Sequence, residues 1–143
     1  MKKDVEITLH AEANQLWGVG GGVADDYCWL TDDNSGSNPL KPREFESTVY
    51  RAKKVTWKGQ SEGAENKDFK VSIDRIDHTG GVEIFGENPL VGHGGKVKES
   101  VEGSAPSGED IYKIHFSIIP VNDPHSSGLS FVIDPKLKVD PTD

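Results

Sequence analysis

An oxygen-rich segment at 32–39, Asp-Asp-Asn-Ser-Gly-Ser-Asn-Pro, has the composition of a calcium-binding loop. Calcium takes carboxylate and carbonyl oxygens from a flexible backbone, so Asp32, Asp33 and Asn34 are candidate ligands. The spacing does not match an EF-hand loop, and no glutamate occupies the closing position of such a loop. The same residue types also make ordinary turns. We therefore expect a solvated turn at 32–39, with a calcium site as the alternative.

Three tryptophans, Trp17, Trp29 and Trp57, are candidates for binding sugars. An exposed indole can stack on the apolar face of a sugar while loop side chains hold the sugar hydroxyls. We expect two of the three to be buried and Trp57 to be exposed, because Trp57 ends an edge-like strand. Trp57 would then form a carbohydrate site with the following loop residues: Asp32, Asp33, Asn34 and Asn38.

The residues that could support catalysis are scattered along the chain. The five histidines lie in separate segments, and none forms an H-x-H or H-x-x-x-H ligand pair. The rings of His10 and His115, both on outward strand faces, would meet only if their strands are neighbours. Four carboxylates lie on a predicted hairpin, and two of them could serve as an acid/base pair for glycoside hydrolysis. Pairs of this kind also arise by chance among 24 acidic residues. These four are Asp74, Asp77, Glu83 and Glu87. We therefore predict no catalytic residues and no enzyme.

Composition restricts the partners and the compartment. The formal net charge is -8, so the surface should repel phosphate backbones and anionic membranes, and we expect neither nucleic acid nor a membrane as a partner. Cys28 is the only cysteine, so no intrachain disulfide can form, and its apolar neighbours indicate an inert buried thiol. The residues after Met1-Lys-Lys contain no uninterrupted apolar segment typical of a secretory signal. We expect a cytoplasmic protein, although a trimmed exported protein would look the same.

Short alternating strands must position all of these residues. The segment Asp4–His10 alternates apolar and polar residues and predicts a first strand. The segment Glu109–Val139 predicts a hairpin at the centre of the fold. In it, Tyr112, Ile114, Phe116 and Ile118 face inward and the odd residues of 129–133 repeat the pattern.

Turn signals separate about nine such strands and leave little or no helix. They include a long strand at Thr48–Trp57 and a hairpin turn at Thr79–Gly81. This pattern predicts an all-β fold, an antiparallel β-sandwich of Greek-key or jelly-roll type. The length suits a single domain over 1–139, followed by a loose tail at 140–143.

Five segments of the second half support a resemblance to a known family. They are Lys-Val-Thr-Trp-Lys-Gly at 54–59, Val-Ser-Ile-Asp-Arg-Ile at 71–76, Val-Glu-Ile-Phe at 82–85, Tyr-Lys-Ile-His-Phe-Ser-Ile at 112–118 and Phe-Val-Ile-Asp-Pro-Lys-Leu-Lys-Val at 131–139. Their order and the terminal Asp-Pro pair resemble the bacterial inclusion-body protein family of the AidA/PixA type. The resemblance covers Lys54–Val139. It implies an all-β domain that self-associates or accumulates under particular growth states, with no catalytic residues to carry over.

Together these observations predict a non-enzymatic bacterial protein that acts by self-association as a homo-oligomer. Edge strands such as Thr48–Trp57 would offer unpaired backbone groups for dimerisation. The alternative is a carbohydrate-binding, lectin-like module that uses Trp57 and the 32–38 loop, with or without calcium. Apart from that calcium, we expect no cofactor.

Overall fold

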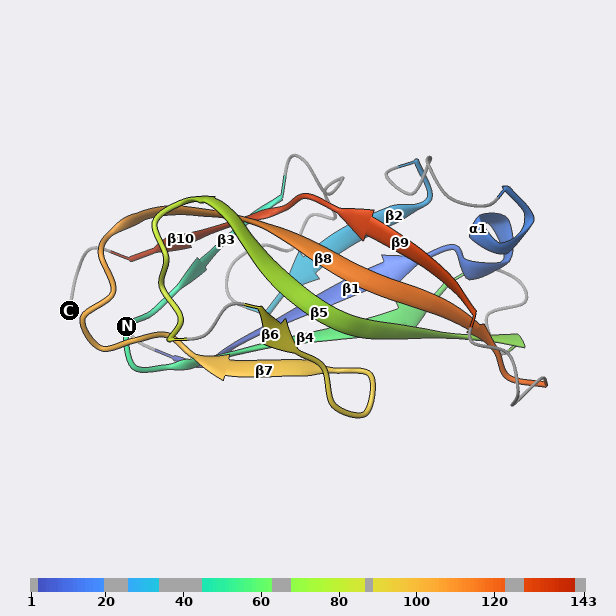
Figure 1. Ribbon diagram of the computed structural model, residues 1–143, viewed down its shortest axis with the longest axis horizontal. Coiled ribbons are helices and arrows are strands. Elements are labelled where there is room, and N and C mark those ends of the chain that lie inside the picture. Colours follow the sequence, from blue (N-terminus) through green and yellow to red (C-terminus); the bar gives the residue numbers. More distant parts are fainter. Residues whose placement is uncertain are drawn as a thin grey trace.

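The computed structural model describes residues 3–19, 26–33, 45–62, 68–86, 89–122 and 128–140. These residues form ten strands and one short helix. Two sheets pack face to face, and in Figure 1 the six-stranded sheet lies in front of the four-stranded one. The all-β fold class predicted from the sequence is therefore confirmed.

The four-stranded sheet has the strand order β2-β1-β4-β7. Its strands are β1 (Val5–Ala11), β2 (Cys28–Asp32), β4 (Lys54–Ser61) and β7 (Val97–Ser100). β1 runs antiparallel to β2 but parallel to β4, with Ile7 opposite Trp57. The alternation in the first predicted strand is confirmed, because Val5, Ile7 and Leu9 of β1 are all buried.

The six-stranded sheet has the strand order β3-β10-β8-β5-β6, and β9 pairs with β8 beyond the end of β10. Its strands are β3 (Glu46–Val49), β5 (Phe69–Gly81), β6 (Leu90–Val91), β8 (Gly108–Pro120), β9 (Leu129–Ile133) and β10 (Lys136–Val139). β3 and β10 are parallel. Together with the β1 and β4 pair, this makes both sheets mixed and corrects the expectation of purely antiparallel strands.

The predicted C-terminal hairpin is confirmed. β8 and β9 pair antiparallel, with Phe116 opposite Phe131, and β8 occupies the middle of its sheet between β5 and the β9 and β10 segments. Its inward residues Tyr112, Ile114 and Phe116 are at most 1% exposed. The rings of Phe116 and Phe131 stack at 5.6 Å between centroids, so this hairpin supplies a large part of the core.

The single helix, α1 (Ala13–Val19), follows β1 directly and lies at one end of the sandwich in Figure 1. Its first turn forms a hydrogen bond from the Leu16 amide to the Glu12 carbonyl. The Leu16 side chain is fully buried, whereas Trp17 is 37% exposed. A seven-residue helix is consistent with the expectation of little helix, and no described helix is long and apolar enough to span a membrane.

The predicted long strand at Thr48–Trp57 is wrong. The chain turns after β3, where Ala52 adopts a positive φ of 65°, and then enters β4 in the opposite sheet. β4 is also an interior strand, so it is not the dimerisation edge that the sequence suggested. The alternation misled because the turn contains neither glycine nor proline, the usual markers of a chain reversal.

The predicted hairpin turn at Thr79–Gly81 is also wrong. All three residues belong to β5, which continues to Gly81 alongside β8. The pairing register shifts between His78 and Gly80, so an extra residue bulges out of the strand. Gly81 has a φ of 70°, and a Cβ there would lie 2.0 Å from the Glu109 carbonyl oxygen. Gly81 therefore allows a close backbone approach, and the segment continues the strand instead of reversing the chain.

Candidate functional site

Trp57, the residue expected to bind sugars, lies in the core and is 1% exposed. Its strand β4 has neighbours on both sides, and its indole points between the two sheets. The indole N–H donates a hydrogen bond to the Tyr112 hydroxyl at 3.2 Å. The ring also makes edge contacts with Phe85 and Tyr112. The prediction that Trp57 is exposed is therefore wrong, and this residue offers no platform for a sugar.

The other tryptophans are closer to the surface. Trp17 on α1 is 37% exposed and packs against Phe69 at 5.4 Å. Trp29 is half-buried on the outer face of β2 and lies parallel to the His10 ring at 5.4 Å. The His10 ring nitrogens contact Glu62 and Thr31, both at 2.8 Å. Because His10 lies in the four-stranded sheet and His115 in the other, the two histidine rings do not meet.

Two of the four candidate loop ligands lie within the described residues, and both bind protein groups. One Asp32 carboxylate oxygen accepts a hydrogen bond from the Ser47 hydroxyl at 2.6 Å. One Asp33 carboxylate oxygen accepts from the Glu6 amide at 2.8 Å. Asn34 and Asn38 lie outside the described residues. Within the described ranges, no cluster of three or more His, Cys, Asp or Glu side chains is arranged to hold a metal, and calcium binding at 32–34 stays a prediction.

The predicted acid/base carboxylates have separate partners. Asp74 accepts a hydrogen bond from the Ser117 hydroxyl at 2.6 Å. Asp77 contacts the His115 ring at 2.7 Å and the Arg75 guanidinium at 3.2 Å. Both carboxylates therefore bind side chains on the outer face of the six-stranded sheet. Glu83 is exposed and lines a small cavity that is partly open to solvent, and Glu87 lies outside the described residues.

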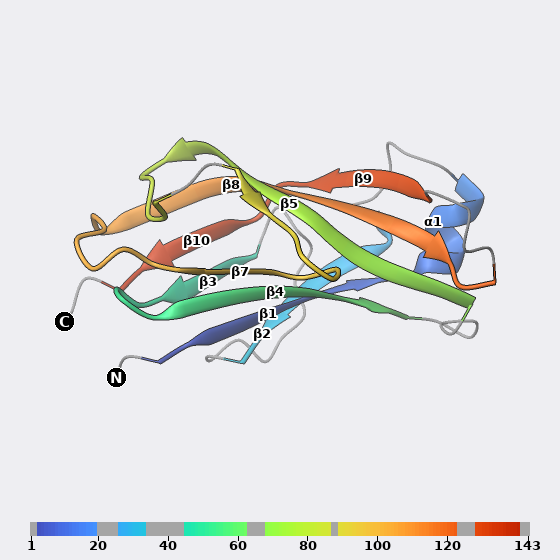
Figure 2. The same ribbon diagram turned by 60° about the horizontal axis from the view of Figure 1, so that its bottom comes forward.

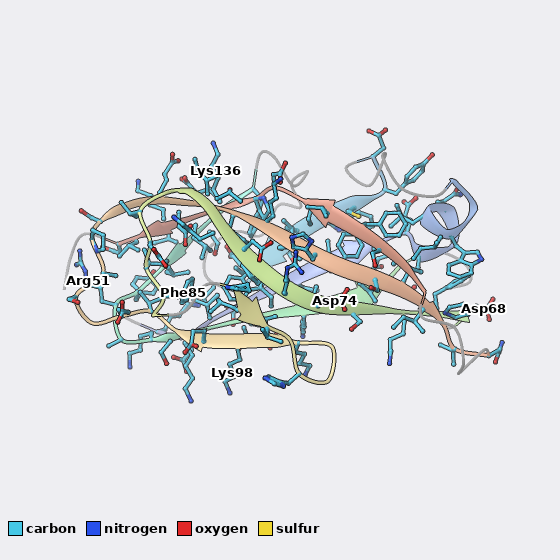
Figure 3. All side chains as sticks on the ribbon, viewed as in Figure 1. Arg51, Asp68, Asp74, Phe85, Lys98 and Lys136 are labelled. Atoms are coloured by element: carbon cyan, nitrogen blue, oxygen red, sulfur yellow. The ribbon has the colours of Figure 1, made fainter. Side chains whose placement is uncertain are left out.

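This cavity gathers four polar side chains, of which Asp110 and Tyr112 are buried, His78 is half-buried and Glu83 is exposed. It lies toward the end of the sandwich away from α1, and Figure 3 labels Phe85 beside it. Its lining residues are Ile76, His78, Glu83, Phe85, Leu90, Asp110 and Tyr112. The cavity volume is about 10 Å³, which suffices for about one water molecule.

A histidine and a carboxylate face each other in this cavity. His78 on β5 and Asp110 on β8 approach to 2.7 Å between the ring Nδ1 and a carboxylate oxygen. The Asp110 side chain is only 3% exposed, whereas the His78 side chain is 22% exposed. The pair therefore joins the two longest strands next to the register shift between His78 and Gly80.

Burial controls the protonation of Asp110 and Tyr112. Burial raises the pKa of Asp110 from its ordinary value of 3.8 to about 6, and the hydrogen bond from His78 opposes that rise only in part. Burial also raises the pKa of the Tyr112 phenol, so this hydroxyl stays protonated and can accept from Trp57. The site can hold a proton near neutral pH, and its cavity has room for about one water molecule.

Sequence reasoning missed the His78 and Asp110 pair, although the sequence contained one signal for it. Asp110 precedes Tyr112 and Ile114 by an even number of residues, so strand alternation places it on the buried face of β8. A buried aspartate needs a hydrogen-bonding partner. No local pattern indicated His78, because the shifted register of β5 determines which of its residues faces Asp110.

Comparison with known proteins identifies the fold. No family model matches this sequence, and no curated protein matches it. Among solved structures, the chain is similar to the crystal structure of the inclusion body protein PixA from Burkholderia cenocepacia J2315, with a TM-score of 0.68 and 10% sequence identity. The match covers 98% of this chain and 97% of that one. The chain therefore has the fold of an inclusion body protein, in agreement with the family resemblance found in its sequence.

Proposed function

We propose that this protein is a non-enzymatic protein that acts by associating with copies of itself, as the term inclusion body suggests for its structural neighbour. The observation that carries the proposal is the extent of the likeness. The fold matches that of an inclusion body protein over 98% of this chain and 97% of the other, so the shared region is the whole neighbour and not one module of it.

The pairing of charges on the outer faces supports association despite the net charge of -8. On the four-stranded sheet, Lys58 forms an ion pair with Glu6 at 2.9 Å. On the six-stranded sheet, Asp77 lies between Arg75 and His115. Charges that are neutralised within one copy oppose the approach of a second copy less than isolated charges do. Local neutralisation therefore lowers the electrostatic cost of bringing two copies together.

The small cavity beside His78 and Asp110 supports a non-enzymatic role for these two residues. At about 10 Å³ it is far smaller than ligand pockets, which commonly measure roughly 300–1,000 Å³. Three of its polar groups have partners within the protein, since His78 contacts Asp110 and the Tyr112 hydroxyl accepts a hydrogen bond from Trp57. We therefore interpret these groups as parts of the core and not as catalytic groups.

Light scattering at several protein concentrations tests the proposal. We expect a dimer or larger particle whose mass grows with concentration and does not change when calcium is added or chelated. Association should strengthen as the pH falls toward the pI of about 5.1, because the net charge that separates the copies falls. A monomer at every concentration and pH would contradict the proposal.

Carbohydrate binding is a second candidate, at a different place from the one that the sequence suggested. Trp29, His10 and Thr31 present an aromatic pair and a hydroxyl side by side on the outer face of the four-stranded sheet. Aromatic rings beside fixed polar groups suit the apolar face and hydroxyls of a sugar. A glycan array would test this function. Glycan binding that is lost in Trp29→Ala and kept in Trp17→Ala would support a carbohydrate site at Trp29. An array without hits would exclude this function.

A further inference from the structure

Three kinds of protection cover most of the described sheet edges. On β7, the Glu99 carboxylate accepts a hydrogen bond from the Ser100 amide at 2.8 Å, and Lys98 adds a charge beside it. On the opposite side, the Ser47 hydroxyl of β3 binds Asp32 of β2 and ties these two edge strands together. β6 has only two residues. Charges, side-chain caps and short length are the devices by which proteins prevent strand addition.

Within the residues that the structure describes, the edge of β9 has none of these devices. Its sequence, Leu-Ser-Phe-Val-Ile at 129–133, contains no charge, no proline and no glycine. β9 pairs with β8 on one side, and within the described part of the chain no other strand pairs with it. Figure 2 shows β9 along the margin of the six-stranded sheet, with β8 on its inner side. Uncharged, β-forming edges of this kind promote strand pairing between molecules.

The register shows which backbone groups of β9 point outward. The Tyr112 amide donates to the Pro135 carbonyl, so the even residues of β8 direct their backbone groups toward the β9 and β10 side. Residues opposite these even positions, such as Phe131 opposite Phe116, direct theirs back toward β8. The N–H and C=O groups of Ser130 and Val132 therefore point away from the sheet. Their side chains are both exposed, and that of Val132 is 43% exposed.

We propose that a second copy of this chain pairs with β9, antiparallel, about a two-fold axis through Phe131. This inference rests on the proposed function and identifies its interface. In that register Ser130 of each copy lies opposite Val132 of the other, and these are the residues whose backbone groups point outward. Each such pair exchanges two hydrogen bonds, so the interface gains roughly four. The two-fold axis makes the contact self-complementary, as a closed dimer requires.

The side chains of β9 suit this arrangement. The Phe131 rings of the two copies would meet on the buried face, where each already stacks on its own Phe116. On the outer face, Val132 would lie beside Ser130 of the second copy, so no like charges face each other across the strands. Charge favours β9 over β7. A two-fold axis through Lys98 or Glu99 of β7 would place that residue directly opposite its own copy, and like charges in such a pair are destabilising.

Proline variants test the interface. Ser130→Pro and Val132→Pro each remove one outward N–H and leave the hydrogen bonds to β8 intact, since proline is tolerated on an edge strand. The matched control Val132→Thr keeps the backbone donor and the β-branched shape. We expect each proline variant to weaken dimerisation at least about tenfold, as measured by analytical ultracentrifugation, and the threonine variant to dimerise nearly as wild type does.

Amide hydrogen exchange on the wild-type protein gives an independent result if a proline variant fails to fold. The amides of Ser130 and Val132 should exchange rapidly in dilute protein and slowly in concentrated protein, while that of Phe131 stays protected throughout. If the wild-type chain associates but these two amides remain fast, or if folded proline variants dimerise as well as wild type, the β9 interface is wrong and self-association through another surface stands. If the wild-type chain is always a monomer, both proposals fail.

Discussion

Replacing Asp110 with asparagine tests the electrostatics of the buried His78 and Asp110 pair. Asparagine has nearly the same shape as aspartate and can still accept the hydrogen bond from the His78 ring, but it cannot ionise. The variant therefore isolates the cost of burying a charge on the inner face of β8, where the Asp110 side chain is 3% exposed.

The sign of the effect follows from the direction of the pKa change. The pKa of Asp110 is about 6 in the folded protein and about 3.9 in an unfolded chain. The folded state thus binds the proton more tightly, so Asp110 contributes most stability below about pH 4. That contribution is lost as the pH rises from about 4 through about 6. Above that range the buried carboxylate is ionised and destabilises the fold.

The size of this change in stability follows from the same two pKa values of Asp110. One pKa unit corresponds to about 1.36 kcal/mol, so the full difference amounts to roughly 3 kcal/mol. We expect the unfolding free energy of Asp110→Asn, relative to wild type, to rise by about 1–3 kcal/mol between pH 4 and pH 8. Most of this rise should fall between pH 4 and pH 7.

Urea unfolding at dilute protein concentration, monitored by tryptophan fluorescence at constant ionic strength, measures this difference. Subtracting the two proteins at each pH cancels the titration of groups that do not interact with Asp110. Asp77→Asn is the matched control, because Asp77 contacts His115 at the same 2.7 Å but is more exposed, on the outer face. Its effect should stay below about 1 kcal/mol. If Asp110→Asn follows wild type at every pH, or loses stability relative to it as the pH rises, the burial argument is refuted.

Three further substitutions test the fold. Phe116→Ala should lower the unfolding free energy by about 3–5 kcal/mol, because the ring is fully buried; a loss below about 1 kcal/mol in urea titrations would mean that the strand face is assigned wrongly. Trp57→Phe should cost roughly 1–3 kcal/mol, since it leaves the buried Tyr112 hydroxyl without its donor; an unchanged urea midpoint would show that water replaces the indole. Gly81→Ala should lower the melting temperature by several degrees, about the effect of 1–3 kcal/mol, because the added Cβ would collide with the Glu109 carbonyl. An unchanged melting temperature in calorimetry would show that the bulge relaxes freely.

The fold class was predictable because strand alternation is a local property. Inward residues such as Ile7, Leu9 and Phe116 recur at every second position, and the pleat of an extended chain places such residues on one face whichever strand lies beside it. The C-terminal hairpin was predictable for the same reason, since its two strands are close in sequence and alternate in phase.

The wrong predictions concern features that depend on contacts between distant parts of the chain. Thr79–Gly81 has the composition of a hairpin turn, yet it continues β5 because β8 provides hydrogen-bonding partners along its whole length. The alternation from Thr48 to Trp57 continues through a turn into another sheet, with Ala52 and not glycine at the positive φ. Local composition does not determine which strands pair, since that choice depends on contacts between residues far apart in the chain.

The sequence by itself determined an all-β chain, the buried face of most strands and a resemblance to inclusion-body proteins. Only the tertiary structure decided that β4 is an interior strand, which buries Trp57, that His78 faces Asp110, and that β9 pairs with a single strand among the described residues. The physical reason is the same in each case. Alternation sets which way a side chain points relative to its own strand, whereas burial, pairing and edge position depend on the neighbours that the fold brings to it.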